Sequence, residues 1–206
     1  MSKALAEDIQ LLDELLAEVV KRTGGEAELT RLHELVDLCQ QADRTQSSAV
    51  REDAVRRIAN LSLAEIEGLL KTLTLRFHLT NKAEQVEIAR INRQRESTAT
   101  PDAPRAESIA EAVAALHQHG ASLPNTLAVL ARLDIQPTLT AHPTEARRRS
   151  ILRQQERLAA ALTDRHDRTL TPVEERRLRT AMLRDIQLML GTDEIRDERP
   201  HVIEEV

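Results

Sequence analysis

The sequence predicts a mainly α-helical protein with one short β-strand at about residues 135–141. Apolar residues recur along most of the chain at the three- and four-residue spacing of an amphipathic helix. Of the 206 residues 41% are hydrophobic, yet Phe77 is the only aromatic residue. Strands favour aromatic and β-branched side chains, so a core of Leu, Ile, Val and Ala suits packed helices. Three capping boxes, in which Ser or Thr precedes Glu by three positions, mark helix starts.

The first 96 residues are expected to form one helical region. Its predicted helices cover residues 4–22, 27–42, 48–59 and 62–96. The glycine pair at 24–25 ends the first helix, and the capping box from Ser62 to Glu65 opens the last. At 1.5 Å rise per residue that last helix would be about 50 Å long.

The long helix at 62–96 has polar residues within its apolar stripe. The stripe consists of Ile66, Leu69, Leu73, Phe77, Ile88 and Ile91. Asn81 and Glu84 occupy the same phase of the helix. They are expected either to form a satisfied buried network, where the helix passes from one core to another, or to line the polar wall of a cleft.

Residues 97–106 contain two prolines and small polar residues, and are expected to form a linker. The remaining region, 107–206, is predicted to be mostly helical. Its predicted helices run from Ser108 to Gly120 and over about 123–132, 144–165 and 172–190. The other two capping boxes open the first and the last of these helices.

Composition excludes several classes of protein. A net charge of -5 and the presence of a single aromatic residue argue against binding to nucleic acid. No run of about 18 apolar residues exists, so no membrane partner is expected and the protein is expected to be cytoplasmic. Cys39, the single cysteine, excludes an intramolecular disulfide and a cysteine-based zinc site. It is expected to be a buried small hydrophobe.

The stretch TLTAHPTEARRR, residues 138–149, is where the periodicity changes. Pro137 and the threonines after it favour an extended chain, whereas Pro143 suits the first position of a helix. His142 therefore stands at the end of a strand and the start of a helix, where ligands gather in parallel α/β proteins.

Arg147, Arg148 and Arg149 are expected in the opening turns of the helix at 144–165. Cations there oppose the helix dipole, while guanidinium groups bind phosphate and carboxylate in a bidentate manner. The combination predicts a site for an anionic substrate. The alternative for the arginines alone is a solvated basic helix face.

These residues carry a resemblance to a known family. LTAHPTEARRRSIL resembles the histidine motif of phosphoenolpyruvate carboxylase, and GTDEIRDERPHVIEEV is similar to the segment that follows it in that family. LTLRFHLTNKAEQVEIARINRQRE is similar to the family's early long helix. The resemblance covers essentially the whole chain, and the pair TAHPTE and TDEIR, in that order and separation, is specific. Leu190 departs from it, because the family usually has an aromatic residue there.

The resemblance implies a Mg²⁺-dependent lyase that joins bicarbonate to phosphoenolpyruvate and releases oxaloacetate and phosphate. The region 107–206, which carries the TAHPTE and TDEIR motifs, would be the start of an α/β barrel, and the strand at 135–141 would belong to that incomplete barrel. A sugar-phosphate or acyl effector and a homotetramer are expected for the full-length enzyme. The magnesium ligands and the family's glycine-rich basic loop are expected outside this chain.

The resemblance also assigns roles to single residues. His142 matches the catalytic histidine, which assists the carboxylation half of the reaction. Arg148 and Arg149 match arginines that line a sugar-phosphate activator site in plant members, and Arg196 matches a further anion-binding arginine.

The end of the chain reads as the first residues of a helix, which favours the amino-terminal section of a longer enzyme, inactive by itself. The alternative is a stand-alone, non-catalytic helical protein derived from that section. Such a protein would bind an anionic metabolite or a complete carboxylase.

Overall fold

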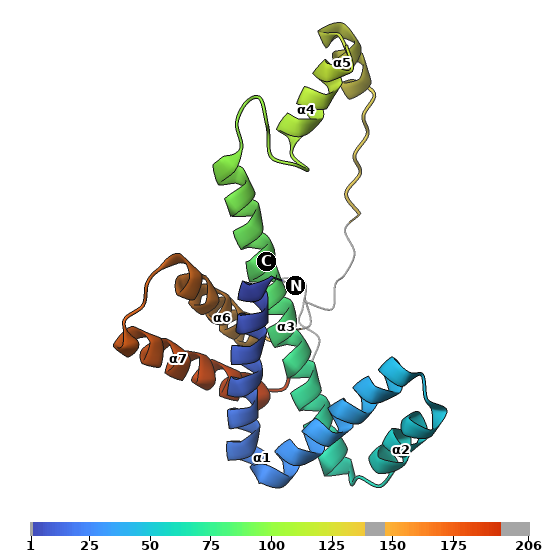
Figure 1. The fold of residues 1–206 in the computed structure, drawn as a ribbon, viewed down its shortest axis with the longest axis vertical. Coiled ribbons are helices and arrows are strands. Elements are labelled where there is room, and N and C mark those ends of the chain that lie inside the picture. The colour runs from blue at the N-terminus through green and yellow to red at the C-terminus, as the bar shows by residue number, and fades with distance from the viewer. Residues whose placement is uncertain (1, 139–146, 195–206) are drawn as a thin grey trace, which may run out of the picture. The chain divides into compact units, whose positions relative to one another are not determined.

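The computed structural model describes residues 2–138 and 147–194. Within these residues it contains helices and no β-strand (Figure 1). The helices are α1 (Lys3–Thr45), α2 (Ser48–Ala59), α3 (Leu63–Thr98), α4 (Ile109–Gln118), α5 (Leu123–Leu130), α6 (Arg149–Asp167) and α7 (Pro172–Leu190). The mainly α-helical class is confirmed.

The short strand is not formed in the part of its range that can be examined. Residues 135–138 have no regular secondary structure, and 139–141 lie outside the described residues. An extended segment becomes a strand only when a neighbouring strand accepts and donates its hydrogen bonds, and the described residues offer no such neighbour. The barrel to which the strand would belong stays a prediction.

The glycine pair interrupts α1 as predicted. Gly25 has φ 84° and ψ 176°, a non-helical conformation inside the span from Lys3 to Thr45. Only glycine adopts such angles without strain. The helix therefore consists of two limbs, and Figure 1 shows the bend between them.

Capping side chains fix the helix starts. Thr171 and Glu174 form a complete capping box at α7. The Ser62 hydroxyl accepts from the Glu65 N–H at 3.4 Å, and the Glu65 carboxylate accepts from the Ser62 N–H at 2.8 Å. At α4 the serine cap forms, but Glu111 accepts from the N–H of the residue before the cap, at 2.6 Å.

The chain divides into two compact units. The first unit comprises residues 1–86 and 146–206, and the second comprises 87–145. The predicted linker, 97–106, falls within the second unit. The core of the first unit is built by the first limb of α1, the first part of α3, α6 and α7. Its fully buried side chains include Leu12, Leu15, Leu158, Leu162, Met182 and Ile186.

The buried face of α3 differs from the predicted stripe. That face consists of Thr72, Leu75, Leu79, Ala83 and Val86. Phe77 is 65% exposed and Ile88 is 59% exposed. Asn81 and Glu84 are exposed as well, so they form no buried network. The helix carries apolar residues on several sides, and packing against the other core helices selects the face that is buried.

Cys39 is exposed, so its predicted burial is wrong. The second limb of α1 packs against α2. That limb buries only Leu32, Leu35 and Ala42. Cys39 lies outside the surface that these contacts cover.

The second unit exposes much apolar surface. Neither α4 nor α5 has a buried residue. Its exposed large apolar residues are Ile88, Ile109, Val113, Leu116, Leu123, Leu127, Val129, Leu130, Leu133 and Ile135. Among the described helices, none has the length and apolar character needed to cross a membrane.

Candidate functional site

Two motifs that are far apart in the sequence meet where α7 ends and α6 begins. The Arg148 N–H donates to the Glu194 carbonyl at 3.0 Å, and Arg148 Nε donates to the Asp193 carbonyl at 2.8 Å. Arg147 Nε lies 2.7 Å from Glu194 Oε1. The TDE part of the second motif therefore holds the first two arginines of the first motif.

The start of α6 lies later than predicted. Arg148 is its N-cap residue, with φ -64° and ψ 132°, and the helix begins at Arg149. Arg147 and Arg148 consequently precede the helix instead of lying in its opening turns. The Glu194 carboxylate beside Arg147 offsets the unfavourable placement of cations at a helix N-terminus.

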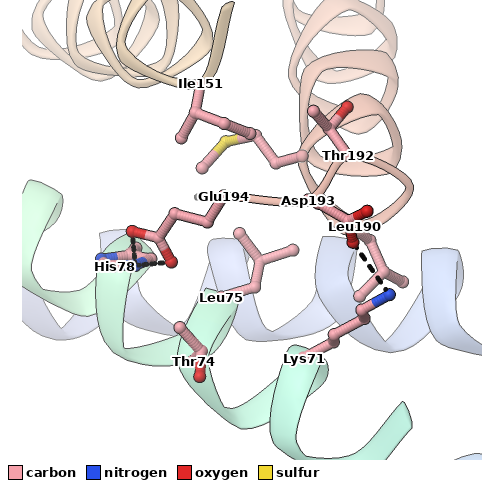
Figure 2. Close-up of a pocket in the computed structure, with 10 residues that line it drawn as sticks. Lys71, Thr74, Leu75, His78, Ile151, Leu190, Thr192, Asp193 and Glu194 are labelled. Atoms are coloured by element: carbon pink, nitrogen blue, oxygen red, sulfur yellow. Dashed lines mark hydrogen bonds and ion pairs between the residues drawn. The ribbon is translucent and has the colours of Figure 1, made fainter. Parts of the chain in front are cut away.

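Helix α3 supplies two further side chains, those of His78 and Lys71, to the same place (Figure 2). His78 Nε2 lies 3.0 Å from Glu194 Oε1 and 3.1 Å from Glu194 Oε2. Lys71 Nζ lies 3.2 Å from Asp193 Oδ1. Lys71 donates hydrogen bonds first to Glu67 and then to Asp193, and these bonds raise the pKa of Lys71, which stays charged at neutral pH. Both acidic side chains of the motif are thus paired with groups on α3.

A cavity of about 160 Å³ lies between α3 and the end of α7. Its polar lining comes from Lys71, Thr74, His78, Thr192, Asp193 and Glu194, and its apolar lining from Leu75, Ile151, Met189 and Leu190. Figure 2 shows the carboxylate of Glu194 directed toward His78. The polar rim is therefore positioned by ion pairs between elements distant in sequence.

Comparison with known proteins decides the family. The family model for phosphoenolpyruvate carboxylase matches residues 5–206. The chain belongs to the phosphoenolpyruvate carboxylase family. The predicted resemblance is confirmed.

Similar carboxylases come from several bacteria. The phosphoenolpyruvate carboxylase of Rhodothermus marinus is 46% identical over 206 residues, which is 100% of this chain and 22% of the relative. That of Roseiflexus castenholzii is 36% identical over 208 residues, with the same shares covered. That of Thermus sp. (strain 71) is 34% identical over 204 residues, 99% of this chain and 22% of the relative. The chain thus spans about a fifth of the length of these carboxylases.

The structure describes two of the four predicted site residues of this carboxylase-family chain. Arg148 is partly exposed and anchored as above, and Arg149 is the exposed first residue of α6. His142 and Arg196 lie outside the described residues. Arg147 contacts Glu194. Glu194 stands two positions before Arg196 in the sequence.

A metal site is expected for carboxylases of this family. The described residues contain no group of three or more His, Cys, Asp and Glu side chains placed to hold a metal ion. The carboxylates of Asp193 and Glu194 face cations instead. The part of the chain that the structure describes does not fit a magnesium site.

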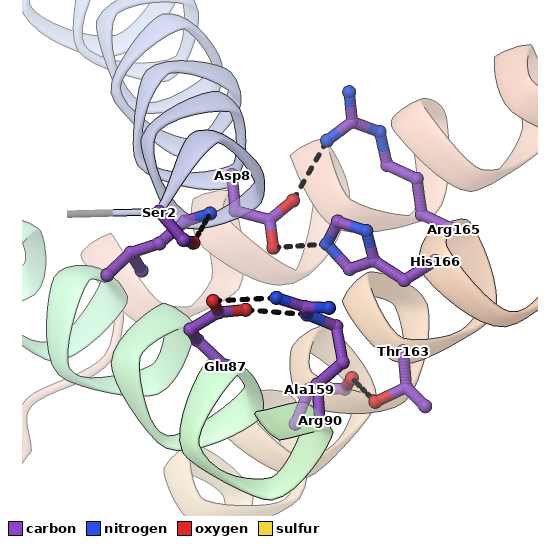
Figure 3. Close-up of polar contacts among 9 residues, drawn as sticks. Ser2, Asp8, Glu87, Arg90, Ala159, Thr163, Arg165 and His166 are labelled. Carbon is purple, nitrogen blue, oxygen red and sulfur yellow. Dashed lines mark hydrogen bonds and ion pairs between the residues drawn. The ribbon is translucent and has the colours of Figure 1, made fainter. Parts of the chain in front are cut away.

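Sequence reasoning missed Lys71 and His78. Both residues lie on a long helix, and the sequence around them gives no sign of a site. Only the tertiary fold places them next to the carboxylase motifs. Sequence reasoning also gave no role to Asp8, whose carboxylate is buried beside Arg165 and His166 (Figure 3). A charged residue one turn before Leu12 on the apolar side of α1 was the only available hint.

Proposed function

We propose that this chain acts as the amino-terminal section of a phosphoenolpyruvate carboxylase, which joins bicarbonate to phosphoenolpyruvate and releases oxaloacetate and phosphate. The observation that carries the proposal is the unbroken match to the family over residues 5–206. The 46% identity to the Rhodothermus marinus carboxylase over all 206 residues supports it, together with the small share of that relative that is covered.

The exposed apolar side chains of the second unit give independent support. Helices α4 and α5 expose Ile109, Leu123 and Leu127 by 85%, 71% and 55%. Exposed apolar side chains in such number are typical of surface that contacts other protein. The remainder of a carboxylase polypeptide would supply that cover.

His142 is proposed as the catalytic group of this section. In the proposed reaction a bicarbonate oxygen attacks the phosphorus of phosphoenolpyruvate, giving carboxyphosphate and the enolate of pyruvate. Carboxyphosphate then releases phosphate and carbon dioxide, to which the enolate carbon adds. An imidazole that titrates near neutrality suits the stabilisation of charge in that second half.

Arg148, Arg149 and Arg196 are proposed to bind the phosphate group of a substrate or of a sugar-phosphate effector. The support for Arg148 is geometric. Its Nε donates a hydrogen bond to the Asp193 carbonyl. No described residue accepts a hydrogen bond from its two Nη atoms. A guanidinium that is fixed through Nε and whose Nη groups meet no acceptor among the described residues suits the oxygens of a phosphate.

Magnesium is proposed to be held by carboxylates outside the described residues, where it would supply positive charge for the developing anions. A cytoplasmic location and a homotetramer are likewise proposed for the full-length enzyme. The alternative function is a stand-alone helical protein that binds an anionic metabolite without catalysis.

A hybrid enzyme tests the proposal. In the Rhodothermus marinus carboxylase, the section that matches this chain is replaced by residues 1–206, and oxaloacetate formation is followed by its reduction to malate. We expect the hybrid to form oxaloacetate and the isolated 206-residue chain to form none. A folded hybrid without turnover contradicts the proposal, and turnover by the isolated chain contradicts the requirement for further segments.

A further inference from the structure

His78 lies on the buried side of α3, between Leu75 and Leu79, which are 4% and 2% exposed. Its own side chain is 15% exposed. Packing on both sides restricts the imidazole, so the position of Nε2 is set by the core. Glu194, 25% exposed, faces this nitrogen with both carboxylate oxygens (Figure 2).

Glu194 also contacts Arg147 and Arg148, so its position affects theirs. Its Oε1 also accepts from Arg147 Nε at 2.7 Å, and its carbonyl accepts from the Arg148 N–H at 3.0 Å. The neighbouring carbonyl, that of Asp193, accepts from Arg148 Nε at 2.8 Å. Among the described residues, the Arg148 guanidinium and backbone N–H thus donate only to Asp193 and Glu194.

The geometry points to His78 and Glu194 as positioning residues for Arg148, with a phosphate monoester as the ligand of that arginine. The ligand assignment rests on the proposed function, whereas the positioning contact does not. Without the His78 donor, Glu194 keeps only Arg147, which stands on the same segment as Arg148. The segment would then keep only the exposed Lys71–Asp193 ion pair as its tie to α3, and the guanidinium would be held less firmly for its ligand.

The first measurement is the amide hydrogen exchange of Arg148, whose N–H donates to Glu194. His78→Leu keeps the volume and removes the donor, and we expect exchange to become about tenfold faster, the factor for about 1.4 kcal/mol. His78→Gln keeps a donor and should stay within about twofold of wild type. Thr74→Val, one turn earlier on α3, alters the cavity without touching Glu194 and is the matched control.

Glu194→Gln is the second variant, because it changes nothing on α3. It should also speed exchange at Arg148 without a general loss of protection in the core. Unchanged exchange at Arg148 in this variant and in a folded His78→Leu overturns the positioning role. If His78→Leu fails to fold, an unchanged exchange rate at Arg148 in Glu194→Gln is by itself enough to overturn the positioning role.

The second measurement uses the hybrid carboxylase and separates two sources of phosphate. The half-saturating concentrations of phosphoenolpyruvate and of glucose 6-phosphate are determined for wild type, His78→Leu, His78→Gln and Thr74→Val. We expect one of the two half-saturating concentrations to rise about tenfold in His78→Leu. This rise should be a larger factor than any fall in the maximal rate. In His78→Gln the half-saturating concentration should return to the wild-type value. The ligand whose value rises is the one at Arg148.

A fall in maximal rate with both half-saturating concentrations unchanged overturns the assignment of a phosphate ligand to Arg148. If the wild-type hybrid forms no oxaloacetate, the proposed function fails. The exchange measurement still decides whether His78 and Glu194 position Arg148, so the two failures are distinguishable.

Discussion

Asp8 Oδ2 lies 2.7 Å from Nε2 of His166, although 158 positions separate the two residues in the sequence. The other oxygen of Asp8 lies 2.9 Å from Arg165 Nη1. Asp8 is only 2% exposed. The pair joins the start of α1 to the last turn of α6, where cations also complement the helix dipole (Figure 3).

Asp8→Asn should destabilise the protein by about 1–3 kcal/mol, because it removes the charge and one of the two acceptor oxygens that Arg165 and His166 contact at this buried position. Urea unfolding followed by circular dichroism measures this. Glu7→Gln, which changes an exposed carboxylate on the same turn, is the control and should cost less than about 0.5 kcal/mol. Equal effects of the two substitutions would show that the buried contact does not stabilise the fold.

Two glycines should respond to alanine with opposite signs. Gly25→Ala forces a side chain into φ 84°, ψ 176° and should destabilise by about 1–3 kcal/mol. Gly68→Ala lies inside α3, where its new methyl group meets only the carboxylate tip of Glu28, at 3.0 Å. It should stabilise by about 0.5–1 kcal/mol. Thermal unfolding of both variants checks the prediction, and a shift of the same sign in both would refute it.

The capping box of α7 should make stability depend on pH. The Thr171 backbone N–H, and then its hydroxyl, donate to Glu174 and hold the pKa of that carboxyl below its ordinary value of 4.5. The unfolded chain therefore binds the proton at higher pH than the folded one. The contribution is present above pH 4.5 and is lost as the pH falls through the lower, folded-state pKa.

Glu174→Gln removes this titration. The wild type should be more stable than the variant at pH 7, and the difference should shrink as unfolding is measured at successively lower pH below 4.5. Glu175→Gln takes the same charge from the first turn of α7 without touching the cap, and is the control. A difference between wild type and Glu174→Gln that does not change with pH would be evidence against the titrating cap.

Local signals in the sequence predicted most helix boundaries. Gly25 and Thr171 act within one or two turns, so their effects follow from the residues themselves. The buried face of α3 could not be found that way, because the helix carries apolar residues on several sides. Phe77 is exposed and Leu79 is buried owing to the helices that pack on α3, and those contacts are tertiary.

The candidate site, like the fold, could be predicted only where the signal is local in the sequence. The motifs around Arg148 and Glu194 could be recognised from their residue types and spacing. His78 could not, since a histidine on a helix has no signature until the fold places it against a carboxylate. The late start of α6 was missed for a similar reason, because the Arg148 N–H finds its acceptor at Glu194 instead of within the helix.

The most direct test of the account is the rate of oxaloacetate formation by the hybrid carboxylase with His142→Asn. We predict a loss of at least about 100-fold in kcat, as expected for removal of a general acid–base group, with unchanged circular dichroism. His117→Asn, at an exposed position of α4, should retain the wild-type rate. A wild-type rate in His142→Asn would contradict the catalytic role of this section.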